Sequence, residues 1–73
     1  MTVTCEIIES IQENLLAFGL AFYIGGRQIC MIEDMTFDRE QIEALCHTIN
    51  TGRVDEIHIR DLVEDAVADW SLI

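Results

Sequence analysis

The chain has 73 residues, enough for one domain with a single hydrophobic core, and we assign residues 1–73 to that domain. Fourteen acidic residues stand against four arginines and no lysine, which gives a formal net charge of −10 at pH 7. Because this charge repels phosphate backbones and anionic lipid headgroups, it argues against direct binding to nucleic acid or to a membrane surface. It favours either a basic protein partner or simple solubility.

The three cysteines, Cys5, Cys30 and Cys46, cannot all pair within one chain. The sequence shows no basic secretory leader, and its longest apolar run, residues 15–24, is about half as long as a membrane-spanning helix. These features predict a cytoplasmic protein with reduced thiols. All three cysteines fall on predicted apolar faces, so we expect them in the core rather than in a metal site.

Residues 2–12 carry two overlapping patterns. Val3, Cys5 and Ile7 alternate with polar residues as in a β-strand, but the isoleucines of the segment are also spaced as on one face of an amphipathic helix. The β-branched residues at its start favour the strand, followed by a polar turn over residues 10–14. The helix remains the alternative.

The glycine pair Gly25-Gly26 separates two strand-like runs, residues 15–24 and 27–33. Two successive glycines readily adopt the positive φ angles of a type I′ turn, so we predict a β-hairpin here. The first run is apolar on both faces, which is typical of a central strand. The second run alternates and places Ile29 and Met31 on one face.

Two helices are predicted in the second half of the chain. Thr36 is the expected N-cap of the first, residues 37–50, and Asn50 and Gly52 are expected to end it. An apolar stripe with helical spacing predicts the second over about residues 55–70. The predicted fold class is α+β: a three-stranded antiparallel meander followed by two helices packed on one face.

Three stretches of the sequence occur in the order found in a known group of proteins: Phe18-Gly19-Leu20, residues 32–40 and residues 58–65. Over about residues 18–66 the chain resembles a family of short, uncharacterised proteins from anaerobic Gram-positive bacteria, classed as a domain of unknown function. The family tends to have an aromatic residue where Ala66 stands here, and the N-terminal stretch matches it poorly. The resemblance supports the order of the elements and implies no activity.

His58, Arg60 and Asp61 form the candidate polar site of the second predicted helix. A histidine beside a carboxylate can serve as a general base or a metal ligand, which would suit a small hydrolytic or metal-binding protein. The simpler explanation is structural, with Asp61 paired to Arg60 or Arg39. No nucleophile or ligand pair stands at a recognisable spacing, so we assign no catalytic residue, metal ligand or cofactor and expect no enzyme.

Asp61, Asp65 and Asp69 stand four residues apart and therefore form one acidic ridge along the second helix. Such a ridge can imitate the phosphate backbone of a nucleic acid and occupy a basic protein. A solvated helix face is the simpler explanation.

Two helices can cover only one face of a three-stranded sheet. The residues expected on or beside the open face are small or apolar: Leu15, Ala17, Ala21, Tyr23, Ile29 and Met31. Because monomers rarely expose a large apolar patch, we expect a protein-interaction module that self-associates, as a homodimer or a higher symmetric oligomer. A helix over residues 2–12 that crossed this face would instead keep the chain monomeric.

Overall fold

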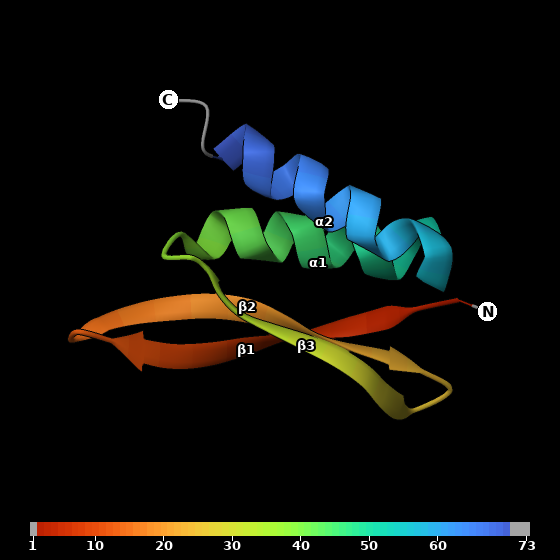
Figure 1. Ribbon diagram of the computed structural model, residues 1–73, viewed down its shortest axis with the longest axis horizontal. Coiled ribbons are helices and arrows are strands. Elements are labelled where there is room, and N and C mark those ends of the chain that lie inside the picture. The colour runs from red at the N-terminus through yellow and green to blue at the C-terminus, as the bar shows by residue number, and fades with distance from the viewer. Residues whose placement is uncertain (1, 71–73) are drawn as a thin grey trace.

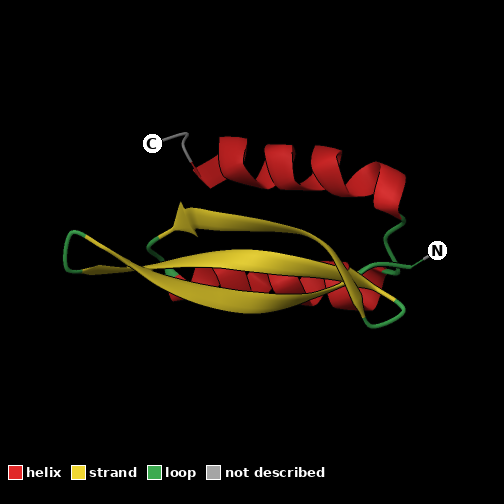
Figure 2. Ribbon diagram, turned by 60° about the horizontal axis from the view of Figure 1, so that its bottom comes forward, coloured by secondary structure: helices red, strands yellow, loops and turns green. Residues whose placement is uncertain are grey.

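The computed structural model describes residues 2–70, which form a sheet layer and a helix layer (Figure 1). The strands β1 (Thr4–Gln12), β2 (Leu15–Ile24) and β3 (Arg27–Thr36) pair antiparallel in the order β1-β2-β3. The helices α1 (Arg39–Gly52) and α2 (Glu56–Trp70) follow and lie on the same side of the sheet (Figures 1 and 2). The predicted α+β meander with two helices on one face is confirmed, and the N-terminal segment is a strand rather than a helix.

Two tight turns connect the strands, and each has positive φ angles at both central residues. Gly25 and Gly26 have φ of 57° and 82°, which confirms the predicted hairpin. Glu13 and Asn14 have φ of 50° and 71° and join β1 to β2. This turn is shorter than the expected polar turn over residues 10–14, because strand pairing continues as far as the Gln12–Leu15 pair.

The hydrophobic core lies between β2 and the helices. Its buried side chains come from β1, β2, both helices and the residue before β1: Val3, Cys5, Phe18, Leu20, Phe22, Ile42, Leu45, Ile49, Ile59 and Val63. β2 is the central strand, as its two apolar faces predicted. Leu16 stands two residues before the buried Phe18, on the same face of β2, but it is 43% exposed. Leu16 belongs to the outer end of the β1–β2 hairpin, which extends past both helices (Figure 1).

The first helix begins two residues later than predicted. Asp38 is the N-cap of α1: it has extended backbone angles, and its Oδ1 accepts a hydrogen bond from the backbone N–H of Glu40 at 2.9 Å. Thr36, the predicted cap, lies two residues before the N-cap and binds the residues around it. Its hydroxyl accepts from the N–H of Asp38 at 3.1 Å and donates to Gln41 Oε1 at 2.7 Å.

Replacing Asp38 with alanine should lower the free energy of unfolding by about 1 kcal/mol, because the Glu40 N–H loses its acceptor at the helix start. Asp38→Asn keeps an acceptor in the same place and should retain most of the stability. Urea denaturation followed by far-UV circular dichroism measures both. A wild-type midpoint for Asp38→Ala would place the helix start elsewhere.

The end of α1 also differs from the prediction. Asn50 and Gly52 lie inside the helix, and Arg53 takes the left-handed conformation that ends it, with φ of 51°. The side chain of Asn50 has a different role, because its amide accepts from the N–H of Cys5 at 2.8 Å and donates to the carbonyl oxygen of Cys5 at 3.1 Å. It therefore binds the outer edge of β1 as a neighbouring strand would.

The edge strand β3 is irregular, which the simple alternation in its sequence did not indicate. Its register with β2 shifts on both sides of Leu20, and Asp34 has a left-handed φ of 55°. At the first shift β3 passes so close to Gly19 that a Cβ atom there would lie 2.1 Å from the carbonyl oxygen of Ile32. A second departure concerns Cys30, which is exposed rather than in the core.

Candidate interaction surfaces

The open face of the sheet provides only part of the apolar surface that was predicted. Leu15 and Met31 are 58% and 48% exposed, and Tyr23 is half-buried. Ala17 and Ala21 are 1% and 2% exposed, although both helices lie on the opposite face. Their register partners on the flanking strands are Ser10 for Ala17, and Glu6 and Met31 for Ala21. This corrects the prediction, because Ala17 and Ala21 offer almost no surface to a partner.

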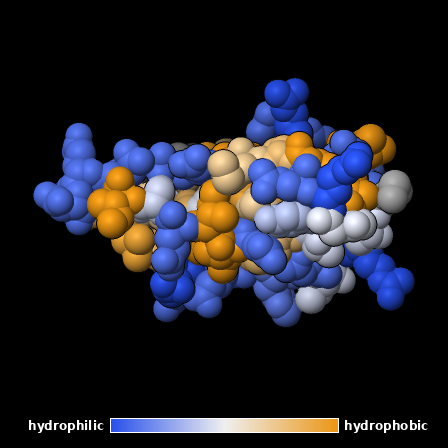
Figure 3. All heavy atoms as spheres, turned by 90° about the horizontal axis from the view of Figure 1, so that it is seen from below, coloured by the Kyte–Doolittle hydropathy of each residue, from blue (hydrophilic) through white to orange (hydrophobic). Residues whose placement is uncertain are grey.

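A polar bridge divides this open face. Asp34 on β3 accepts hydrogen bonds from Ser10 Oγ and, at 3.1 Å, from Gln12 Nε2, both on β1. Since β2 lies between the two edge strands, the bridge crosses the central strand beside Ala17, the register partner of Ser10. Figure 3 accordingly shows apolar areas interspersed with hydrophilic side chains rather than one continuous patch.

The alternation predicted that Ile29 and Met31 share one face of β3. In the structure Ile29 does not lie with Met31 on the open face. The β2–β3 register shifts beside Tyr23, which makes Ile29 an extra residue in β3 and places it in a groove between β3 and α2. The groove encloses about 390 Å³, a volume typical of binding pockets. Its lining is mainly apolar with a charged rim: Phe22, Ile29, Cys30, Ile32, Glu56, Ile59, Arg60, Val63 and Glu64.

The outer end of the β1–β2 hairpin, residues 11–16, is exposed throughout, and we call it the hairpin arm. It extends past the helix layer (Figure 1) and carries Ile11, 74% exposed, next to its register partner Leu16. Leu15 lies on the opposite face of the arm. Sequence reasoning missed Ile11 and Leu16 as surface residues. The available signal was that Ile11, Leu15 and Leu16, all large aliphatic residues, stand within two positions of the Glu13-Asn14 turn.

The free edge of β1 is covered along only half of its length. The N–H of Val3 donates to the carbonyl oxygen of Val54 at 2.9 Å, and Asn50 binds both backbone groups of Cys5. Backbone groups alternate between the two sides of a strand, so the odd-numbered residues that follow, up to Ile11, also direct N–H and C=O outward. Within residues 2–70, no backbone hydrogen bond beyond the sheet reaches this second half.

The predicted polar site is divided between two surfaces. His58 and Asp61 line a hollow of about 420 Å³ beside the α1–α2 connection, together with Asp65. Arg60 lies instead on the rim of the β3–α2 groove, with its Nε 3.6 Å from Glu64 Oε1. Asp61 was expected to pair with Arg60 or Arg39. This expectation is wrong, because Arg60 pairs with Glu64 and Arg39 pairs with Glu9 at 3.0 Å. No three His, Cys, Asp or Glu side chains among residues 2–70 are placed to hold a metal ion.

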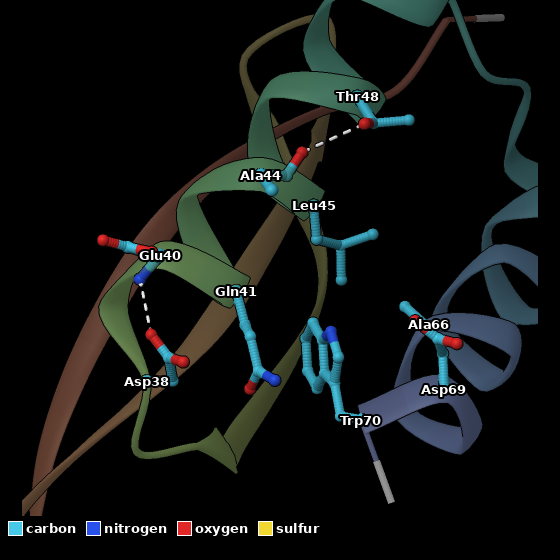
Figure 4. Close-up of a pocket in the computed structure, with 9 residues that line it drawn as sticks. All are labelled: Asp38, Glu40, Gln41, Ala44, Leu45, Thr48, Ala66, Asp69 and Trp70. Atoms are coloured by element: carbon cyan, nitrogen blue, oxygen red, sulfur yellow. Dashed lines mark hydrogen bonds between the residues drawn. The ribbon is translucent and has the colours of Figure 1, made fainter. Parts of the chain in front are cut away.

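The acidic ridge of Asp61, Asp65 and Asp69 follows the side of α2 that borders α1. All three carboxylates are exposed, and Asp69 lines a second hollow of about 460 Å³ between the start of α1 and the end of α2. Figure 4 shows Trp70 and Gln41 reaching into this hollow from opposite sides. The ridge thus lines two separate hollows, with Asp61 and Asp65 at the first and Asp69 at the second.

Neither helix of residues 2–70 has both the length and the apolar character needed to cross a membrane. The resemblance noted above remains an expectation drawn from its motifs. No family model, curated protein or solved structure matches the chain.

Proposed function

We propose that the protein is a non-enzymatic interaction module of the cytoplasm that self-associates through the hairpin arm and the adjoining edge of β1. The exposure of Ile11, Leu15 and Leu16 on both faces of the arm carries this proposal. A partner laid against one face would leave the other exposed. A strand added to the edge extends both faces together, and its side chains pack directly beside Ile11, with Leu15 and Leu16 one strand further in.

A second copy of the chain suits this edge because the pairing is reciprocal. Two β1 strands that meet antiparallel about a two-fold axis give each other the partners that their outward backbone groups lack. With the two-fold axis at Glu9, the middle of the free half, Ile11 of each copy lies opposite Ile7 of the other. Once both edges are paired the contact is closed, so association stops at the dimer.

The net negative charge of the chain opposes this association, but an arginine partly neutralises the acidic side chain at the β1 edge. Each copy carries a formal net charge of −10, so two copies repel each other at long range. At the edge itself, Glu9 is paired with Arg39 at 3.0 Å, and the Arg39 guanidinium also lies 4.9 Å from the centre of the Phe18 ring. Salt screens the long-range repulsion and leaves the apolar contact intact.

Sedimentation or light scattering from micromolar to millimolar concentration should therefore show a monomer–dimer equilibrium that added salt strengthens. The Ile11→Ser, Leu16→Ser double variant should remain monomeric at a cost of only about 1 kcal/mol in fold stability, because Ile11 is largely exposed and Leu16 partly exposed in the monomer. Ile57→Ser is the matched control: Ile57 is 79% exposed, lies on α2, and should leave the dimer unchanged.

A wild-type chain that stays monomeric over the whole range contradicts the proposal. If the Ile11→Ser, Leu16→Ser variant still forms dimers, the dimer contact lies on another surface. The competing partner is a basic protein bound to the acidic ridge, and its binding would weaken with salt instead. The sign of the salt effect therefore separates the two kinds of partner.

A further inference from the structure

Two of the three cysteines lie side by side where the sheet meets α1. The sulfur atoms of Cys5 on β1 and Cys46 on α1 are 3.4 Å apart. Each thiol also approaches the backbone of the other residue: Cys5 Sγ lies 3.7 Å from the carbonyl oxygen of Cys46, and Cys46 Sγ lies 3.6 Å from that of Cys5. The two residues are 41 positions apart in the sequence, so only the folded chain brings them together.

The position of this pair is fixed by Asn50, one helical turn beyond Cys46. Its amide makes two hydrogen bonds to the backbone of Cys5, at 2.8 and 3.1 Å, and its Nδ2 also lies 3.5 Å from Cys46 Sγ. The last turns of α1 are thus held against β1 at the level of the two thiols. These hydrogen bonds keep the Cys5 backbone beside the helical turn that follows Cys46.

The third cysteine cannot take part in this pair. Cys5 and Cys30 are both register partners of Phe22, on opposite sides of the central strand. Two strand spacings amount to about 9.5 Å, beyond the roughly 7 Å between Cα atoms that a disulfide can bridge. Cys30 is exposed and separate, which makes it a built-in reference thiol.

We propose that Cys5 and Cys46 form a reversible oxidation site, which a low-molecular-weight disulfide of the glutathione class converts to an intramolecular disulfide. All three cysteines are free thiols in the structure. A disulfide bond is about 2.05 Å long, so the sulfur atoms at 3.4 Å need to approach by little more than about 1 Å. Reduced thiols that oxidise only transiently are typical of redox-sensing sites in the cytosol.

The reaction begins at Cys46, because it is the more accessible of the two thiols. Its thiolate attacks one sulfur of the small disulfide, which releases one thiolate and leaves a mixed disulfide on Cys46. The Cys5 thiolate then attacks the Cys46 sulfur and expels the second small thiolate. The protein loses two protons and two electrons, and the small disulfide is reduced to two thiols.

Burial makes the second step slow at neutral pH. While both thiols are free, burial and, to a smaller extent, the hydrogen bond and charge of Cys46 raise the pKa of the Cys5 thiol to about 12; burial, the largest cause, still acts when Cys46 is in the mixed disulfide. Below this pKa the thiolate fraction of Cys5 rises about tenfold for each pH unit. The rate of disulfide closure should therefore increase about tenfold for each pH unit between neutral and mildly alkaline pH.

The full chain, reduced and then treated with oxidised glutathione in the presence of EDTA, should yield a proteolytic peptide in which Cys5 is linked to Cys46. In the Cys30→Ser variant, intact mass spectrometry after alkylation should show a loss of two hydrogen atoms, no alkyl group and no retained glutathione. The melting temperature should rise on the order of 10 °C and return to its original value with dithiothreitol. Cys30→Ser, Cys46→Ser should show no closure.

Two results would overturn the proposal. One is a Cys30→Ser chain that keeps both remaining thiols alkylatable after oxidation. The other is stable glutathione on Cys46 without a link to Cys5. Because Cys30→Ser changes only an exposed residue, neither result can be attributed to a misfolded variant.

Discussion

Replacing Gly19 with alanine should leave most of the chain unfolded. A Cβ atom at Gly19 would lie 2.1 Å from the carbonyl oxygen of Ile32 and 2.9 Å from the Cα atom of Glu33. Both atoms belong to the backbone of β3, so no side-chain rotation can relieve the contact. The strand itself would have to move away from β2.

The expected loss is about 3 to 5 kcal/mol, at the upper end for single substitutions. A domain of this size has about 4 to 11 kcal/mol of total stability, so the variant should be largely unfolded or melt far below the wild type. Circular dichroism and urea denaturation measure this directly.

Gly52→Ala provides the matched control. Gly52 is the last residue of α1, and a Cβ atom there would meet only Val54 Cγ2, at the ordinary distance of 3.6 Å. Because alanine favours the helix, stability should stay the same or rise by up to about 1 kcal/mol. Equal stability of the two glycine variants would contradict the close approach of the β3 backbone to Gly19.

The strands and helices were predictable because each has a strong local pattern. The Gly25-Gly26 turn and the apolar face of α1 identify their elements without reference to the rest of the chain. The boundaries of α1 were less certain, since Thr36 and Asp38 are both good caps and only the fold selects Asp38. Local patterns determined which elements form, and tertiary contacts determined where α1 starts.

Features that join distant segments were not predictable from spacing. The contact between Cys5 and Cys46 depends on how α1 crosses β1, and the role of Asn50 depends on the same crossing. Asn50 was therefore interpreted as a helix stop, which is the usual role of asparagine near a helix end. No pattern within either segment indicates its partner.

The bulges of β3 account for the differences on the open face. A strict alternation of side chains assumes regular pairing, and each register shift moves the following residues relative to β2. Ile29 consequently lines the β3–α2 groove, and Asp34 reaches across to Ser10. Neither position follows from the sequence of β3 alone.

Replacing Ala21 with glutamate should unfold the protein rather than only separate a dimer. Ala21 is 2% exposed, and its register partners are Glu6 on β1 and Met31 on β3. A glutamate here would place a carboxylate in a covered site, directly beside the carboxylate of Glu6. We expect a loss of about 3 kcal/mol or more in the free energy of unfolding. Urea denaturation at a concentration where the chain is monomeric measures it.

Met31→Glu is the informative comparison, because it adds the same charge to the neighbouring strand at a side chain that is already 48% exposed. Its fold stability should change by no more than about 0.5 kcal/mol. If dimers form through the hairpin arm, sedimentation should show that Met31→Glu weakens them far less than the Ile11→Ser, Leu16→Ser pair does. Complete loss of the dimer in Met31→Glu, with the fold intact, would instead place the contact on the open face of the sheet. An Ala21→Glu chain as stable as the wild type would show that the flanking side chains leave that face uncovered.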